Sequence, residues 1–94
     1  MSDFGTKWFE FERARDIRAP VELDALRAAG HDVLDIRDTY PLVRQAMRRE
    51  LADEVVVARE RLLADTVDAD RAADLAAATT ELVLFLAWEL EVKP

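Results

Sequence analysis

The chain contains no cysteine, one histidine and one serine, and each shortage removes a class of chemistry. Without cysteine there is neither a disulfide framework nor a thiolate metal site. A Ser-His-Asp mechanism is excluded because the sole serine, Ser2, lies at the chain terminus. We interpret His31, which follows Gly30, as part of a turn; the alternative is a divalent metal held with Asp35. We therefore expect no catalytic residue set, no metal and no cofactor.

Glycine and proline are also scarce, with two glycines and three prolines among 94 residues. Apolar residues make up 51% of the chain and charged residues 35%, which is typical of an ordered, helix-rich protein. A chain this short buries only about 60–65% of the surface that its unfolded form exposes. We expect one small helical domain over residues 1–94, with residues 1–6 as a flexible lead, and oligomerisation to supply further stability.

No apolar run is long enough to cross a membrane, because the longest, Leu82 to Trp88, is far shorter than the roughly 20 residues required. The N-terminal residues lack the basic and apolar segments of a signal peptide. The net charge of −7 repels phosphate groups and anionic lipid. We therefore expect a cytoplasmic protein that binds neither a membrane nor nucleic acid.

The first third of the chain predicts two elements. Aromatic residues alternate with glutamates over residues 7–13, which favours a β-strand. A lone strand cannot pair its own backbone, so this one would pair with its copy in a second subunit; a helix or an extended arm is the alternative. Pro20 suits the first turn of a helix and Gly30 its end, which predicts a short helix over residues 20–29.

The remainder of the chain predicts two long helices, at about residues 41–65 and 69–92. Pro41 favours a helix start, and Asp68 is placed to cap the second helix. Residues 31–40 fit either one or two helical turns or a packed loop. Because the break between the long helices is short, they should pack as an antiparallel hairpin. The predicted fold class is thus mainly α, completed by oligomerisation.

Each long helix carries two apolar stripes. We expect the stronger stripes to face each other inside the hairpin, namely Met47, Leu51, Val55 and Leu62 against Leu75, Leu82, Leu86 and Leu90. Apolar residues left outside the hairpin need another surface to cover them. We therefore predict a partner interface formed by Ala52, Val56, Leu63, Leu84, Trp88 and Val92.

These features favour a non-catalytic protein–protein interaction module. An accessory subunit, an adaptor or a small acidic protein inhibitor would each fit an acidic helical chain with surplus apolar surface. Its partners would be further copies of itself, in a dimer or higher oligomer, or a larger protein.

An aromatic strand followed by a short helix, a break and a longer helix resembles the ribbon-helix-helix DNA-binding proteins, over about residues 7–52. The resemblance implies a regulator or antitoxin whose strands pair across a dimer, with the Arg44–Arg49 cluster on DNA phosphates. Here Glu10 and Glu12 occupy the outward strand positions, where a ribbon that reads the groove carries Arg, Lys, Gln or Asn.

Glu50, Asp53 and Glu54 place three carboxylates on neighbouring turns of the first long helix. The E-x-x-D formed by Glu50 and Asp53 resembles the second half of the acidic motif in MazG-type nucleotide pyrophosphohydrolases, which are all-α enzymes. The resemblance implies magnesium-dependent nucleotide hydrolysis, although the sequence lacks the upstream E-x-x-E half. A solvated acidic face is the alternative.

Overall fold

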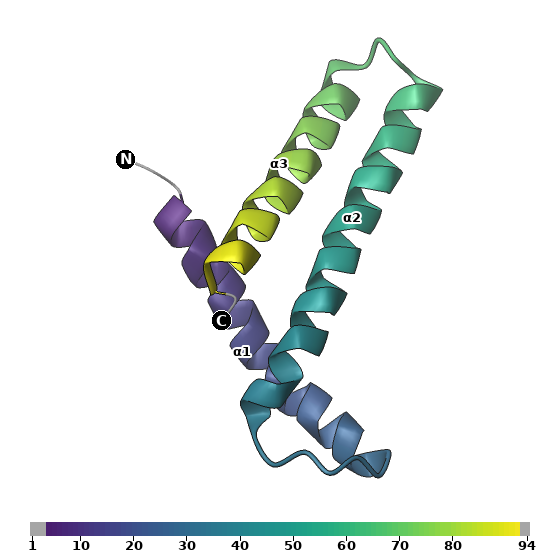
Figure 1. Ribbon diagram of the computed structural model, residues 1–94. Helices are drawn as coiled ribbons and strands as arrows, with labels where there is room; N and C mark the ends of the chain where they lie inside the picture. The colour runs from purple at the N-terminus through teal and green to yellow at the C-terminus, as the bar shows by residue number, and fades with distance from the viewer. Residues whose placement is uncertain (1–3, 93–94) are drawn as a thin grey trace. The chain divides into compact units, whose positions relative to one another are not determined.

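The computed structural model describes residues 4–92, most of which belong to three α-helices (Figure 1). These are α1 (Phe4–Ala28), α2 (Tyr40–Ala64) and α3 (Ala69–Val92), with a short 3-10 helix, η1 (Ile36–Thr39), immediately before α2. No β-strand occurs over residues 4–92. The predicted mainly α class is confirmed.

The chain divides into two compact units, Met1–Ala46 and Met47–Pro94. The first unit contains α1, η1 and the first turns of α2, and the second contains the rest of α2 together with α3. The single domain over residues 1–94 and the completion of the fold by oligomerisation both stay predictions.

Helix α1 corrects the predictions for the N-terminal third. Residues 7–13 are helical, so the predicted β-strand is wrong and the alternative of an N-terminal helix is confirmed. The predicted helix over 20–29 is the last part of the same helix. Residues 4–6 of the predicted flexible lead also belong to α1, whereas residues 1–3 of that lead lie outside the described part of the chain.

The burial pattern of α1 explains the error. Alternation of aromatic residues over a few positions is too short to separate a period of two from a helical period. Over the whole helix, buried and half-buried residues recur every three or four positions, at Trp8, Phe11, Arg15, Ala19, Leu23 and Leu26. Phe9, on the other side, is 62% exposed. A longer window would therefore have indicated the helix.

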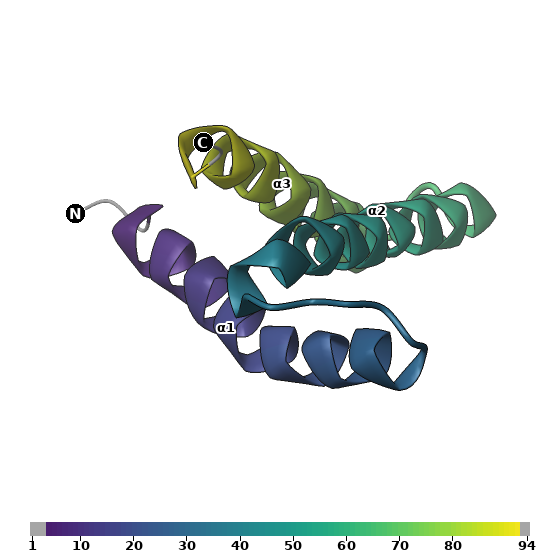
Figure 2. The same cartoon turned by 60° about the horizontal axis from the view of Figure 1, so that its bottom comes forward.

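Pro20 lies inside α1 and not at its start. Proline lacks an N–H group and its ring displaces the preceding turn, so a proline inside a helix bends it. Figure 2 shows the axis of α1 changing direction midway. The carbonyl group that loses its helical donor belongs to Asp16, which is exposed, so water can bond to it.

Gly30 ends α1, as predicted. Its φ of 91° is in the left-handed region that favours glycine. The Gly30 N–H donates to the Arg27 carbonyl at 3.0 Å, and the His31 N–H donates to the Leu26 carbonyl at 2.9 Å. These two bonds form the Schellman motif that closes many helices. The interpretation of His31 as part of a turn is confirmed.

The connection after α1 turns back along that helix and leads into η1 (Figure 2). The Arg27 guanidinium donates to the Val33 carbonyl at 3.2 Å and so ties the connection to α1. Asp35 then caps η1 by accepting a hydrogen bond from the Arg37 N–H at 2.9 Å. Residues 31–40, for which a packed loop and helical turns were both expected, thus form a largely exposed loop followed by one helical turn.

Side chains of α1 and α2 meet within the first unit around Tyr40. The Arg15 guanidinium lies 4.2 Å from the centre of the Tyr40 ring, at the distance of a cation–π contact. Thr39 is fully buried and its hydroxyl donates to the Ile36 carbonyl at 2.6 Å. Val43, one turn into α2, is also buried.

In the second unit, α2 and α3 lie side by side and antiparallel in both views (Figures 1 and 2). Asp68 caps α3, because its carboxylate accepts hydrogen bonds from the N–H groups of Asp70 at 2.9 Å and Arg71 at 3.2 Å. The Arg71 guanidinium donates to the Arg61 carbonyl at 2.7 Å and so links the two helices beside the connection. The predicted helices at about 41–65 and 69–92, and the cap at Asp68, are confirmed.

The buried side of α3 corrects the predicted pairing of stripes. Phe85 and Trp88 have 0% exposure, with ring centroids 5.3 Å apart. Leu86 and Leu90, predicted to lie inside the hairpin, are 39% and 78% exposed. Both sides of α3 are apolar, so the apolar stripes in the sequence did not show which side of the helix is buried. The aromatic side chains of Phe85 and Trp88 have more surface to bury than leucine side chains do. In α2, by contrast, the buried Met47 lies on the predicted stripe.

Candidate interaction surfaces

The second unit has an uncovered apolar stripe along α3. We define this α3 stripe by six exposed residues, Ala72, Ala76, Thr79, Val83, Leu86 and Leu90. At about 100° per residue, no charged residue of α3 falls within the half of the helix centred on the stripe. All charged residues lie on the other half, at Asp70, Arg71, Asp74, Glu81, Glu89 and Glu91.

An ion pair joins α2 to α3 near the C-terminal end of the stripe. The Arg48 Nε and Nη2 atoms lie 2.8 Å from the Glu89 Oε1 and Oε2 atoms respectively, so the ion pair is bidentate. The Glu89 side chain is only 14% exposed. The hydrogen bond to Glu89 raises the pKa of Arg48 above its usual value. This ion pair therefore links α2 to α3 at the boundary between the buried side of α3 and the α3 stripe.

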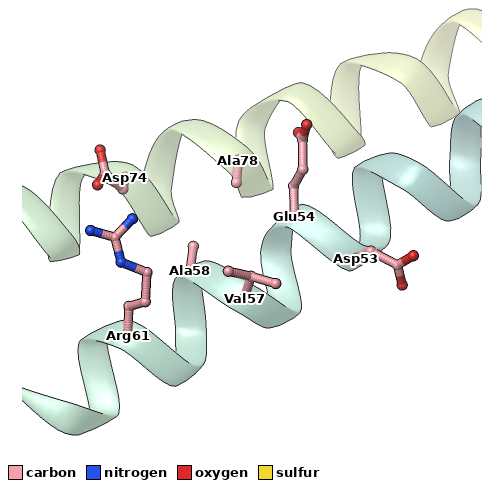
Figure 3. A pocket seen from close by; sticks show the side chains of 7 residues that line it. All are labelled: Asp53, Glu54, Val57, Ala58, Arg61, Asp74 and Ala78. Atoms are coloured by element: carbon pink, nitrogen blue, oxygen red, sulfur yellow. The ribbon is translucent and has the colours of Figure 1, made fainter.

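A groove of about 370 Å³ lies between α2 and α3 (Figure 3). Its lining is mixed in character, with Asp53, Glu54, Val57, Ala58, Arg61, Asp74 and Ala78. Figure 3 shows Arg61 directed toward Asp74, Glu54 directed toward α3, and Asp53 directed away from it. Because the Asp53 and Glu54 carboxylates point in different directions, they do not form a single anionic site in the groove.

The carboxylates suggested by the MazG resemblance lie exposed on α2. These are Glu50, Asp53 and Glu54, and Figure 3 shows the last two pointing to different sides. Over residues 4–92, no three histidine, aspartate or glutamate side chains are grouped so that they could hold a metal ion. The structure thus does not bring the three predicted carboxylates together as one ligand set.

The first unit has a smaller groove of about 240 Å³ between α1 and the start of α2. It is lined by Ile17, Arg18, Val21, Glu22, Val43 and Ala46. Ile17 and Val21 are largely exposed and stand one turn apart on α1. The groove is large enough for one apolar side chain, with a cation and an anion at its edge.

The ribbon-helix-helix architecture is wrong for this chain, because its ribbon would come from residues that belong to α1. Two of the arginines near the expected phosphate contacts also have acidic partners. Arg48 is bound to Glu89, and Arg37 lies 2.7 Å from a carboxylate oxygen of Asp35. The hydrogen bond from the Arg37 side chain lowers the pKa of Asp35 and, in turn, Asp35 raises that of Arg37.

The six residues of the predicted partner interface differ in exposure. Trp88 is fully buried, Leu84, Val92 and Ala52 are half-buried, and Val56 and Leu63 are exposed. The interface stays a prediction. Sequence reasoning missed the small members of the α3 stripe, although their alternating spacing of four and three residues is visible in the sequence.

None of the helices within residues 4–92 combines the length and apolar character needed to cross a membrane. Comparisons of the chain with protein-family models, curated proteins and solved structures find no match.

Proposed function

We propose that this chain is a non-catalytic protein–protein interaction module that acts as a helical dimer or higher oligomer, alone or as an accessory part of a larger cytoplasmic assembly. The antiparallel hairpin of α2 and α3 is its platform, and the α3 stripe is its contact surface. The observation that carries the proposal is the exposure of Val83, Leu86 and Leu90 together on one side of α3, at 57%, 39% and 78%.

Charge supports this reading of the stripe. Charged residues make up 35% of the chain, yet the half of α3 that is centred on the stripe contains no charged residue. Solubility favours surfaces on which charges are interspersed, and contiguous apolar patches usually mark contacts with other molecules. The stripe therefore suits recognition better than exposure to water.

The proposal is tested by placing one charge on the stripe. Leu90→Glu should weaken self-association at least about tenfold, because a buried unpaired carboxylate is strongly unfavourable at an apolar contact. Sedimentation equilibrium at micromolar concentrations measures this change. Circular dichroism should show unchanged helicity, because Leu90 is exposed in the single chain.

Val67→Glu is the matched control, because Val67 is exposed but lies in the connection between α2 and α3, off the stripe. It should associate like the wild type. A wild-type chain that stays monomeric and retains no other protein on an affinity column would contradict the proposed function.

A further inference from the structure

We infer that the α3 stripe is the seam of an antiparallel helix pair, and that its occupant is the α3 stripe of a second copy of this chain. The inference rests on the proposed function and names the partner, the contact surface and the orientation of the pair. Its basis is the spacing, the side-chain sizes and the charges of the stripe.

The spacing of the stripe is that of a coiled coil. From Ala72 to Leu90, successive members are separated by four, three, four, three and four residues. This heptad pattern keeps one seam facing a neighbouring helix, and each seam residue inserts between residues of that helix. The surface therefore fits another α-helix with the same repeat.

The sizes of the seam residues favour a second copy in the antiparallel orientation. The stripe is graded in size along the helix: its N-terminal end has two alanines, its centre has Thr79 and Val83, which are similar in size, and its C-terminal end has two leucines. In an antiparallel pair, Leu90 faces Ala72 of the second copy. By the same register, the facing pairs that follow are Leu86 with Ala76 and Val83 with Thr79. The outer layers then combine a leucine with an alanine, and the central layers combine two side chains of intermediate size. The total side-chain volume is therefore similar in every layer, and the helices pack at an even distance.

The parallel orientation lacks this match. Each residue would face its own copy, with two leucines meeting at Leu90 and two alanines at Ala72. The helices would have to diverge toward the leucine end or leave space at the alanine end, and unfilled space destabilises a packed contact.

Charge also favours this pairing. Two copies of a chain with a net charge of −7 repel each other, so their contact has to avoid like charges. The α3 stripe contains no charged residue. The antiparallel orientation also places the acidic ends, marked by Glu89 and Glu91, at opposite ends of the pair. A parallel pair would bring these carboxylates together.

The available area is sufficient for a dimer contact. Helix α3 has 24 residues, and a helix of that length is about 36 Å long and about 10–12 Å across. Half of its side surface is therefore about 550–700 Å². Two copies would together bury about 1,100–1,400 Å², which exceeds the roughly 1,000 Å² expected of a specific interface.

The absence of cysteine makes a crosslinking test direct, because each variant carries a single thiol. Full-length Leu90→Cys and Ala72→Cys chains are mixed and oxidised mildly. The antiparallel pair brings these two positions together and so predicts the mixed disulfide in at least about fivefold excess over either homodimer. Glu91→Cys, one residue along and turned about 100° around α3, should give little mixed product with Ala72→Cys.

The remaining outcomes separate the inference from the proposed function. An excess of disulfides between like positions would establish a parallel pair and overturn the orientation. A dimer in sedimentation that gives no crosslink would overturn the α3 seam and leave the proposed function standing. A monomer without crosslinks would overturn the inference together with the oligomeric part of the proposed function.

Discussion

The two sides of α3 are both apolar, but only one of them is covered within the chain. One side contains Phe85 and Trp88, which are fully buried and in contact with each other. The other contains Val83, Leu86 and Leu90, which are exposed. Hydrophobicity alone does not distinguish the two sides; the difference is that large aromatic side chains bury more surface than leucine or valine.

Under the proposed function, the buried side of α3 contributes to stability and the exposed side to association. Substitutions on the buried side should act on the free energy of unfolding, because they remove packed contacts. Substitutions on the exposed side should leave unfolding nearly unchanged and act on association, because surface changes alone alter stability by less than about 0.5 kcal/mol.

The largest effect is expected on the buried side. Trp88→Ala should lower the free energy of unfolding by about 3–5 kcal/mol, because it leaves a cavity where a fully buried side chain was. Urea denaturation followed by circular dichroism measures this loss. Leu90→Ala on the stripe, compared with the wild type at a concentration at which both chains are monomeric, should change stability by less than about 0.5 kcal/mol. Equal losses in the two variants would remove the distinction between the sides.

A smaller effect is expected at the edge between the two sides. Arg48→Ala should lower the free energy of unfolding by about 1–2 kcal/mol, because it leaves the largely covered Glu89 carboxylate without its bidentate partner. The double variant Arg48→Ala/Glu89→Gln should recover part of that loss. A double-mutant cycle in urea measures the coupling, and additive losses would show that the ion pair contributes nothing.

The smallest effect is expected at Asp35 and Arg37, which lie outside α3. It serves as a reference for the comparison between the two sides of α3. The hydrogen bond from the Arg37 side chain lowers the pKa of Asp35 in the folded chain. The carboxylate therefore contributes stability above its unfolded pKa, and this contribution is lost as the pH falls through its lower folded pKa. In a carbon-13 NMR titration, Arg37→Ala should raise the Asp35 midpoint. An unchanged midpoint would contradict the role assigned to Arg37, and association through α3 should be unaffected.

The sequence predicted well where the signals are local. Asp68 caps α3 through its own side chain, and Gly30 ends α1 through its own positive φ. The long helices were found because a helical period sustained over more than twenty residues has no competing interpretation. For the candidate site, sequence reasoning identified surplus apolar surface on α3. The interface that it predicted at Leu84, Trp88 and Val92 stays a prediction, and the α3 stripe lies on the opposite side of the helix.

The failures have physical causes. Pro20 is a usual start signal, yet α1 continues through it, because helical residues on both sides outweigh the one lost hydrogen bond. The aromatic alternation near Phe9 was too short to specify a strand against a helix. Leu86 and Leu90 were expected inside the hairpin because they belong to the stronger apolar stripe of α3, but an apolar stripe does not by itself specify which of two apolar sides packs.

By itself the sequence determined that the chain is mainly α, where its two long helices begin and end, and that α3 has more apolar surface than one neighbour would cover. These properties depend on helix caps, turn residues and apolar periodicity, and each of these signals lies within or next to the element that it specifies. Only the tertiary structure decided that Trp88 lies on the buried side of α3 and Leu90 on the exposed one. That choice depends on the fit of side chains distant in the sequence, and no local pattern encodes it.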